Sequence, residues 1–137
     1  MRLTIVAASI LLAVPAAAQQ HQLDTLTVPQ AISRAADASP KPIRAVVEFK
    51  VQSAAKSHGG YYLDSEKDFH SAANLGVMIR PSAMPALTQK YGEDLKAALV
   101  GKTVKIIGQV RRRAVAGGSA TATQVEVTHA GQILSVS

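Results

Sequence analysis

The sequence predicts a mainly β domain of five short strands, with a helix between the third and fourth strands and a shorter helix before the first. Three observations support this fold class. Apolar and polar residues alternate in five separate segments, which is the period of a half-buried strand. Two other segments carry apolar residues at helical spacing. Glycine and proline separate these segments, as turns require.

The first 18 residues have the three parts of a secretory signal peptide. Arg2 gives a positive start, residues 3–14 form an apolar core, and Ala16-Ala17-Ala18 offer a cleavage site before Gln19. A membrane helix needs about 20 apolar residues, so this run is too short to cross a bilayer. We therefore expect residues 1–18 to be removed during export and the protein to be periplasmic or secreted.

The mature chain has the size of one domain and is basic. Removing 18 residues from 137 leaves 119, and the sequence has no cysteine, so the apolar core must stabilise the fold without disulfides. Losing Arg2 leaves 14 Lys and Arg residues against nine Asp and Glu, a net charge of +5. That charge favours a polyanionic ligand. Only five aromatic residues, none of them tryptophan, are present to stack on bases.

Residues 19–42 are predicted to be a polar lead-in followed by a short helix. Thr27 can cap the start of that helix, and Pro29 fits its first turn. We expect the small apolar face of this helix to pack on Val46 and Ile107, two apolar residues that interrupt the alternation of their strands.

The strand segments lie within residues 43–137. In the first, every second residue from Ala45 to Val51 is apolar, whereas residues 54–60 are predicted to be a turn or loop. The fourth has Gly108 in its middle, and glycine inside a strand usually marks a bulge or a sharp bend. The five segments are residues 44–53, 61–65, 74–80, 101–113 and 122–136.

The longer helix is predicted before the fourth strand, over residues 86–101. Leu87, Tyr91 and Leu95 recur there at helical spacing. Gly92 weakens the middle of this helix and is a candidate point for splitting it.

The order of these elements resembles the OB-fold, a small five-stranded Greek-key barrel. The stretches VVEFKVQ, GGYYLDSE, LGVMI, LVGKTVKIIGQV and ATQVEV are similar to its five strands, in that order. The resemblance covers residues 43–136 and points to an exported bacterial OB-fold protein of the nucleic-acid-binding-like type. It implies a five-stranded OB-fold barrel over residues 43–137, with one helix between strands three and four.

The resemblance also implies where a ligand would bind. OB-fold proteins bind oligonucleotides or oligosaccharides on the second and third strands, flanked by the loops that join strands one to two and four to five. Those loops correspond to residues 53–60 and 112–121. Lysine and arginine side chains would contact phosphates, and a tyrosine would stack on a base. The expected ligand-binding residues are Lys56, Tyr62, Arg80, Arg111, Arg112 and Arg113.

The expected ligand is single-stranded nucleic acid or another polyanion, and two alternatives stay open. The same groove could hold an envelope protein. The arginines could instead be solvated charges at a strand end, which discourage edge pairing. We expect a monomer or weak oligomer with no membrane span after signal cleavage.

The sequence shows no pattern that indicates catalysis or metal binding. Its four histidines lack ligand spacing, and no cysteine is present to bind zinc. The acidic segment 64–68 lacks the ligand spacing of a calcium loop and is predicted to be a solvated turn. Gly101-Lys102-Thr103 follows a helix and begins a strand, the reverse of a phosphate-binding loop. We therefore expect a protein without cofactor, metal site or enzymatic activity.

Overall fold

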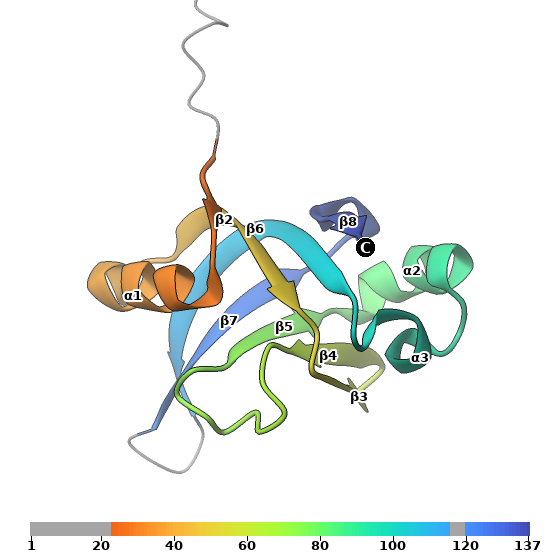
Figure 1. Cartoon of the computed structure of the whole chain (residues 1–137), viewed down its shortest axis with the longest axis horizontal. Helices are drawn as coiled ribbons and strands as arrows, with labels where there is room; N and C mark the ends of the chain where they lie inside the picture. The colour runs from red at the N-terminus through yellow and green to blue at the C-terminus, as the bar shows by residue number, and fades with distance from the viewer. Residues whose placement is uncertain (1–22, 116–119) are drawn as a thin grey trace, which may run out of the picture.

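The computed structural model describes residues 23–115 and 120–137 and has a mainly β fold (Figure 1). The predicted signal peptide lies outside the described residues. The strands are β1 (Thr25–Leu26), β2 (Ile43–Lys50), β3 (Ser53–Ser57), β4 (Gly60–Asp64), β5 (Leu75–Ile79), β6 (Thr103–Ala114), β7 (Thr121–Val127) and β8 (Ile133–Val136). The helical segments are α1 (Val28–Ala38), η2 (Pro81–Ala83), α2 (Met84–Tyr91), α3 (Leu95–Leu99) and η3 (Ala130–Gln132).

These eight strands of the described chain form one mixed sheet. Its hydrogen-bonded order is β1-β2-β6-β7-β5-β4-β3, and β8 pairs with β6 beside that path. The pairs β1–β2 and β5–β7 are parallel, and the other pairs are antiparallel. The prediction of a mainly β domain is confirmed. The prediction of a closed five-stranded barrel is wrong as stated, because the sheet has eight strands in an open path.

The predicted first strand is divided because its backbone changes partner. β2 pairs with β6, whereas β3 pairs with β4. At the junction, Val51 N donates to Lys102 O at 2.9 Å, and Gln52 N donates to Asp64 O at 2.9 Å. One short segment therefore connects β2, which lies next to β1 near one end of the hydrogen-bonded path, with β3 at the other end.

Residues 54–60 form most of β3 and the turn into β4, so the prediction of a turn or loop is wrong for residues 54–57 and correct for the turn at His58 and Gly59. His58 and Gly59 have φ values of 46° and 79° and make a two-residue hairpin turn. Positive φ at both positions is typical of a type I′ turn. The strand was missed because Ala54-Ala55-Lys56-Ser57 lacks the β-branched and aromatic residues that favour strands.

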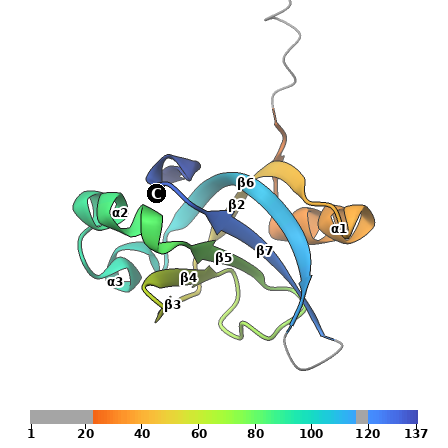
Figure 2. The same cartoon turned by 180° about the vertical axis from the view of Figure 1, so that it is seen from behind.

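Alternate strand residues point into one apolar core, as the period of two predicted. In β6, Val104, Ile106 and Val110 are fully buried. Helices α2 and α3 lie at one end of the molecule and α1 lies at the other end (Figures 1 and 2). Among the described residues, no helix combines the length and hydropathy that crossing a membrane would require.

Local signals set the helix boundaries that the sequence predicted. Thr27 Oγ1 accepts from Gln30 N at 3.4 Å, and Gln30 Oε1 accepts from Thr27 N at 3.0 Å, which is a capping box at the start of α1. Gly92 has φ 96° and separates α2 from α3. Asp94 Oδ1 then accepts from Ala97 N at 3.1 Å and caps α3.

Helix α1 belongs to the fold, although it does not pack where the sequence predicted. Its Ala31 and Ala35 are fully buried and join the same core as Val47. Val46 follows on the opposite face of β2 and lies outside that core, because successive strand residues face opposite sides. The helix therefore covers core residues, and Ile107 lines an open groove instead.

Candidate anion-binding groove

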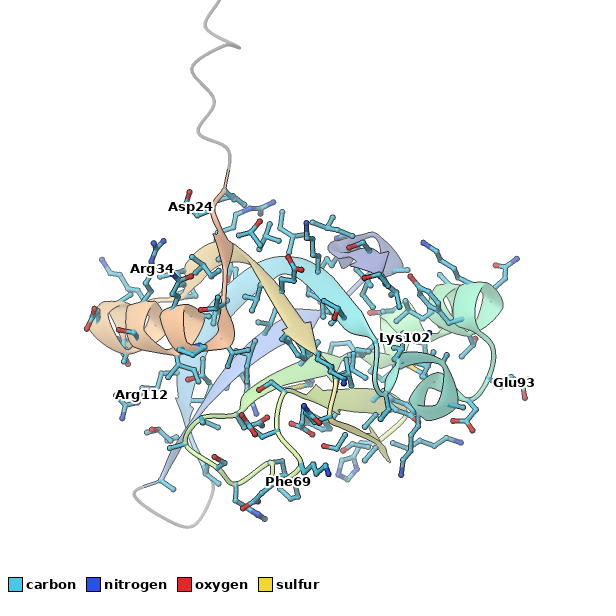
Figure 3. The ribbon with its side chains drawn as sticks, in the orientation of Figure 1. Asp24, Arg34, Phe69, Glu93, Lys102 and Arg112 are labelled. Atoms are coloured by element: carbon cyan, nitrogen blue, oxygen red, sulfur yellow. The ribbon has the colours of Figure 1, made fainter. Side chains whose placement is uncertain are left out.

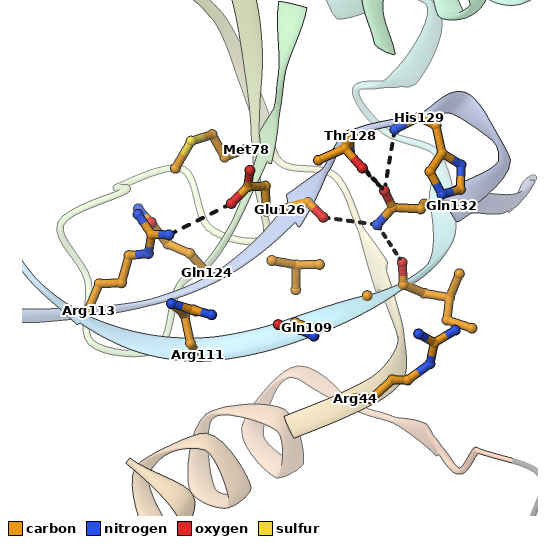
Figure 4. Close-up of a pocket in the computed structure, with 13 residues that line it drawn as sticks. Arg44, Met78, Gln109, Arg111, Arg113, Gln124, Glu126, Thr128, His129 and Gln132 are labelled. Carbon is orange, nitrogen blue, oxygen red and sulfur yellow. Dashed lines mark hydrogen bonds and ion pairs between the residues drawn. The ribbon is translucent and has the colours of Figure 1, made fainter. Parts of the chain in front are cut away.

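A groove of about 320 Å³ opens on the outer face of the sheet, where β6 and β7 separate (Figure 4). The two strands are paired from Val110 opposite Val125 to Ala114 opposite Thr121. Before Val110 the strands diverge, and the groove lies over this divergence. The groove is lined by Arg44, Met78, Ile107, Gly108, Gln109, Arg111, Arg113, Gln124, Val125, Glu126, Thr128, His129 and Gln132.

Gln132 bridges the two strands at the point of divergence. Its Nε2 donates to Ile107 O at 3.0 Å and to Glu126 O at 2.9 Å, one carbonyl from each strand. Its Oε1 accepts from Thr128 N at 2.7 Å, from Thr128 Oγ1 at 3.1 Å and from His129 N at 3.3 Å. A side chain fixed by so many partners forms a rigid end wall for the groove (Figure 4).

Gly108 allows β6 to approach the residues behind the groove. A Cβ atom at this position would lie 3.0 Å from Val125 Cγ1 and 3.1 Å from Gln132 Nε2, so a side chain would crowd both. Of the two expectations for Gly108, a bulge or a sharp bend, the bulge is absent against β2, because β6 pairs with β2 in unbroken register through Gly108. The register shift of β6 lies instead at Lys105–Ile106, opposite β8.

Three arginines of the described chain line the groove, and they come from two neighbouring strands. Arg44 lies on β2 opposite Gln109, while Arg111 and Arg113 lie two residues apart on β6 and therefore share one face. Neither Arg44 nor Arg111 forms an ion pair with a described residue. Two guanidinium groups are thus available to an anion.

Glu126, on β7, is the one acidic side chain among the described lining residues. Its Oε1 accepts from Arg80 Nε at 2.8 Å, and its Oε2 lies 3.7 Å from Arg113 Nη2. The hydrogen bond from Arg80 lowers the pKa of Glu126 against the effect of desolvation, and the charges of Arg80, Arg113 and Arg111 lower it further. Glu126 is therefore ionised at neutral pH and holds two arginines in place.

An aromatic ring and a thioether extend this face away from β6. Tyr62 on β4 lies opposite Met78 on β5, and Met78 lies in register with Glu126 on β7. These three residues form one row across the sheet. Tyr62 is partly exposed, so its ring is accessible beside the groove.

The structure brings four of the six predicted ligand-binding residues to this outer face. Arg111 and Arg113 on β6 line the groove. Arg80 forms an ion pair with Glu126, and Tyr62 is the first residue of the row across the sheet. The four residues are Tyr62, Arg80, Arg111 and Arg113.

The other two predicted residues point to the opposite face. Lys56 lies opposite Tyr61, and Tyr61 is buried, so Lys56 is on the core side of the exposed end of β3. Arg112 lies opposite the buried Thr123, and its Nε donates to Thr121 Oγ1 at 2.9 Å. Three consecutive arginines cannot share one face of a strand, because successive side chains alternate. Arg112 projects from the end of β6 in Figure 3.

Sequence reasoning missed Arg44 and Glu126 as groove residues. The alternation of the first strand predicts that Arg44 faces outward, but its place beside Gln109 depends on the pairing of β2 with β6. The predicted loops contribute little to the groove: residues 54–57 are strand, and residues 116–119 lie outside the described part of the chain.

The acidic segment between β4 and β5 is only partly the solvated turn that was predicted. Asp64 and Ser65 are buried, whereas residues 66–68 are exposed. Asp64 Oδ1 accepts from Asn74 Nδ2 at 2.9 Å. Burial raises the pKa of Asp64, and hydrogen bonds to Asn74 and Ser53 oppose this increase.

The side chains of the groove could donate charge-assisted hydrogen bonds to an anion. Guanidinium groups surround an ionised carboxylate, with amide side chains beside them. Within residues 23–115 and 120–137, no group of three His, Cys, Asp or Glu side chains is placed to hold a metal ion. A scan against protein-family models and a search of curated proteins find no match to this chain.

Proposed function

We propose that this protein is a non-enzymatic binding module for single-stranded nucleic acid or another polyanion. The observation that carries the proposal is the gathering of Arg44, Arg111 and Arg113 in one groove, with Arg80 beside it. These four positive charges face one negative charge, that of Glu126. A concave surface with excess charge of one sign attracts ligands of the opposite sign.

The positions of these side chains suit contacts with a chain of anionic groups. A guanidinium group donates two parallel hydrogen bonds to a phosphate or a carboxylate. Tyr62 would supply a stacking surface for a base next to the groove. Because the arginines stand on paired strands, their backbone needs no rearrangement when a ligand binds, and only their side chains lose conformational freedom.

We further assign the central strands to an elaborated OB-fold type. The order β2-β6-β7-β5-β4, the parallel pair β5–β7 and the helical segment between β5 and β6 support this assignment. The apolar N-terminal segment with its cleavage motif supports action outside the cytoplasm, in the periplasm or beyond the cell.

The test is a salt titration of the chain from Gln19 onward with a fluorescent single-stranded thymidine oligonucleotide. Affinity should fall with salt by a log–log slope of about 0.7 for each phosphate contacted. Changing Arg44, Arg111 and Arg113 together to alanine should weaken binding and reduce that slope by about 2, because about three phosphate contacts are lost.

A matched control removes the same charge elsewhere. Lys90, Lys96 and Lys102 are exposed residues at the end of the molecule that carries α2 and α3, and Lys102 is labelled in Figure 3. Changing these three to alanine should leave most of the affinity intact. Equal losses in the two triple variants would refute a groove-specific site, and salt-independent binding would favour a protein partner in the cell envelope.

A further inference from the structure

The groove contains few aromatic rings, and this limits how well it could bind the bases of a nucleic acid. Among the described lining residues, His129 alone carries an aromatic ring. Tyr62 lies beyond Met78 in the row across the sheet. Proteins that bind single-stranded nucleic acid stack successive bases on several aromatic side chains. This groove therefore offers few of the contacts that favour bases over other groups.

The groove strands offer side chains and little free backbone to a ligand. β6 lies between β2 and β7, and β7 lies between β6 and β5. Where β6 and β7 separate, Gln132 already donates to the carbonyls of Ile107 and Glu126. Extended peptides commonly bind by pairing with a free sheet edge. An acidic peptide would find no such edge in this groove.

Neutral polar groups and apolar surface lie together in the groove. Gln109 and Gln124 contribute amides, and Glu126 contributes a carboxylate that can accept hydrogen bonds. Ile107 and Met78, which are both partly exposed, contribute apolar surface. A sugar ring has a matching composition, because its hydroxyl groups need donors and acceptors while its C–H face packs on apolar side chains.

The unpaired charges and the volume of the groove further limit the charge and size of the ligand. Arg44 and Arg111 form no ion pair with described residues, whereas Arg80 and Arg113 are both held by Glu126. The groove therefore presents two free guanidinium groups and a fixed carboxylate. Its volume of about 320 Å³ is at the lower end of the range for ligand pockets, about 300–1,000 Å³.

We propose that the groove binds an acidic oligosaccharide, with one uronic acid unit seated over the divergence of β6 and β7. Arg111 binds the carboxylate of that unit, and Glu126 accepts a hydrogen bond from a neighbouring sugar hydroxyl. Arg44, on the other side of Gln109, binds the carboxylate of the next unit (Figure 4). Gln109 and Gln124 hydrogen-bond to the remaining hydroxyls. The inference rests on the proposed function and narrows its ligand class.

Glu126 is the residue that would select for this class. Both ligands carry one negative charge on each unit, but the phosphodiester linkage of a DNA strand has no hydroxyl group. A phosphate beside the Glu126 carboxylate is therefore repelled without gaining a hydrogen bond. A uronic acid unit places a hydroxyl there instead and gains a hydrogen bond to a charged acceptor. The same side chain therefore weakens one class of ligand and strengthens the other.

The experiment compares four probes by calorimetry with the chain from Gln19 onward: tetragalacturonate, neutral maltotetraose, tetraglutamate and a thymidine oligonucleotide with four phosphates. The proposal expects tetragalacturonate to bind most tightly and maltotetraose not to bind. Glu126→Gln should weaken tetragalacturonate about tenfold, as expected for loss of a hydrogen bond to a charged group. The same change should strengthen the oligonucleotide.

Two further variants keep the result interpretable. Glu48→Gln alters a carboxylate that lies 3.7 Å from Lys105 Nζ and outside the groove lining, and it should change neither affinity. Arg111→Gln breaks no ion pair between described residues and should abolish tetragalacturonate binding. Thermal melts of each variant show whether it has folded.

The outcomes separate this inference from the function on which it rests. Tighter binding of the oligonucleotide than of tetragalacturonate would overturn the inference and leave the polyanion-binding proposal standing. Equal binding of tetraglutamate would show that carboxylates suffice and would also overturn it. If no anionic probe binds in a salt-dependent way, both proposals are wrong.

Discussion

Replacing Gln132 with methionine tests whether one side chain holds the groove open at the correct width. Methionine keeps the length and approximate volume of glutamine but can neither donate nor accept in the same way. Five hydrogen bonds are lost, to Ile107 O, Glu126 O, Thr128 N, Thr128 Oγ1 and His129 N. Gln132 is 9% exposed, but its partners Thr128 and His129 are exposed residues, so water can replace part of these hydrogen bonds.

The expected cost follows from those contacts. A net contribution of about 0.5–1.5 kcal/mol for each bond gives an upper range of about 2.5–7.5 kcal/mol. Water entering from the open groove re-hydrates part of the freed backbone, and methionine retains apolar contacts. We therefore expect the free energy of unfolding to fall by about 2–4 kcal/mol. For a domain of this size that loss lowers the melting temperature by about 8–16 °C.

The assay is thermal and urea unfolding followed by circular dichroism, with Gln109→Met as the matched control. Gln109 is an exposed glutamine of the same groove, and its substitution should change stability by less than about 0.5 kcal/mol. If Gln132→Met is no more destabilising than Gln109→Met, the bridge does not hold β6 and β7 together. The account of the groove as a preformed site would then be wrong.

Two further predictions concern the core and the response to acid. Leu63→Ala removes a fully buried side chain and should cost about 2–5 kcal/mol in urea unfolding, whereas Leu134→Ala, at a side chain that is 51% exposed, should cost little. Burial raises the pKa of Asp64 in the folded state above the value of 3.8 expected for the unfolded chain. The protonated carboxyl therefore stabilises the fold at pH values below 3.8, and this stabilisation is lost as the pH rises through the folded-state pKa. Asp64→Asn should remove that part of the pH dependence of the urea midpoint, and an unchanged profile would contradict the assignment.

The sequence was sufficient wherever structure depends on near neighbours in the chain. Alternation of apolar residues predicted β5, β6 and β7 and the side chains that fill the core. The capping signal at Thr27 and the break at Gly92 were also readable, because caps and left-handed positions depend on one or two residues.

Features that depend on pairing between distant segments could not be read in the same way. The change of partner at Val51 and Gln52 has no local signal, so one predicted strand became two. The groove joins Arg44 to Gln109 and Met78 to Glu126 through registers that only the folded sheet defines. Alternation alone would have excluded Arg112 from a site shared with Arg111 and Arg113.

The pairing of β2 with β6 also has a consequence for the order of events during synthesis. Ile43 pairs with Val110, and Lys50 pairs with Thr103. Most of the chain must therefore be synthesised before β2 can pair with β6. Contacts between such distant segments form slowly. During synthesis the β2 segment, in which alternate residues are apolar, therefore lacks its hydrogen-bonding partner until β6 has been made. Until then this segment is prone to aggregation.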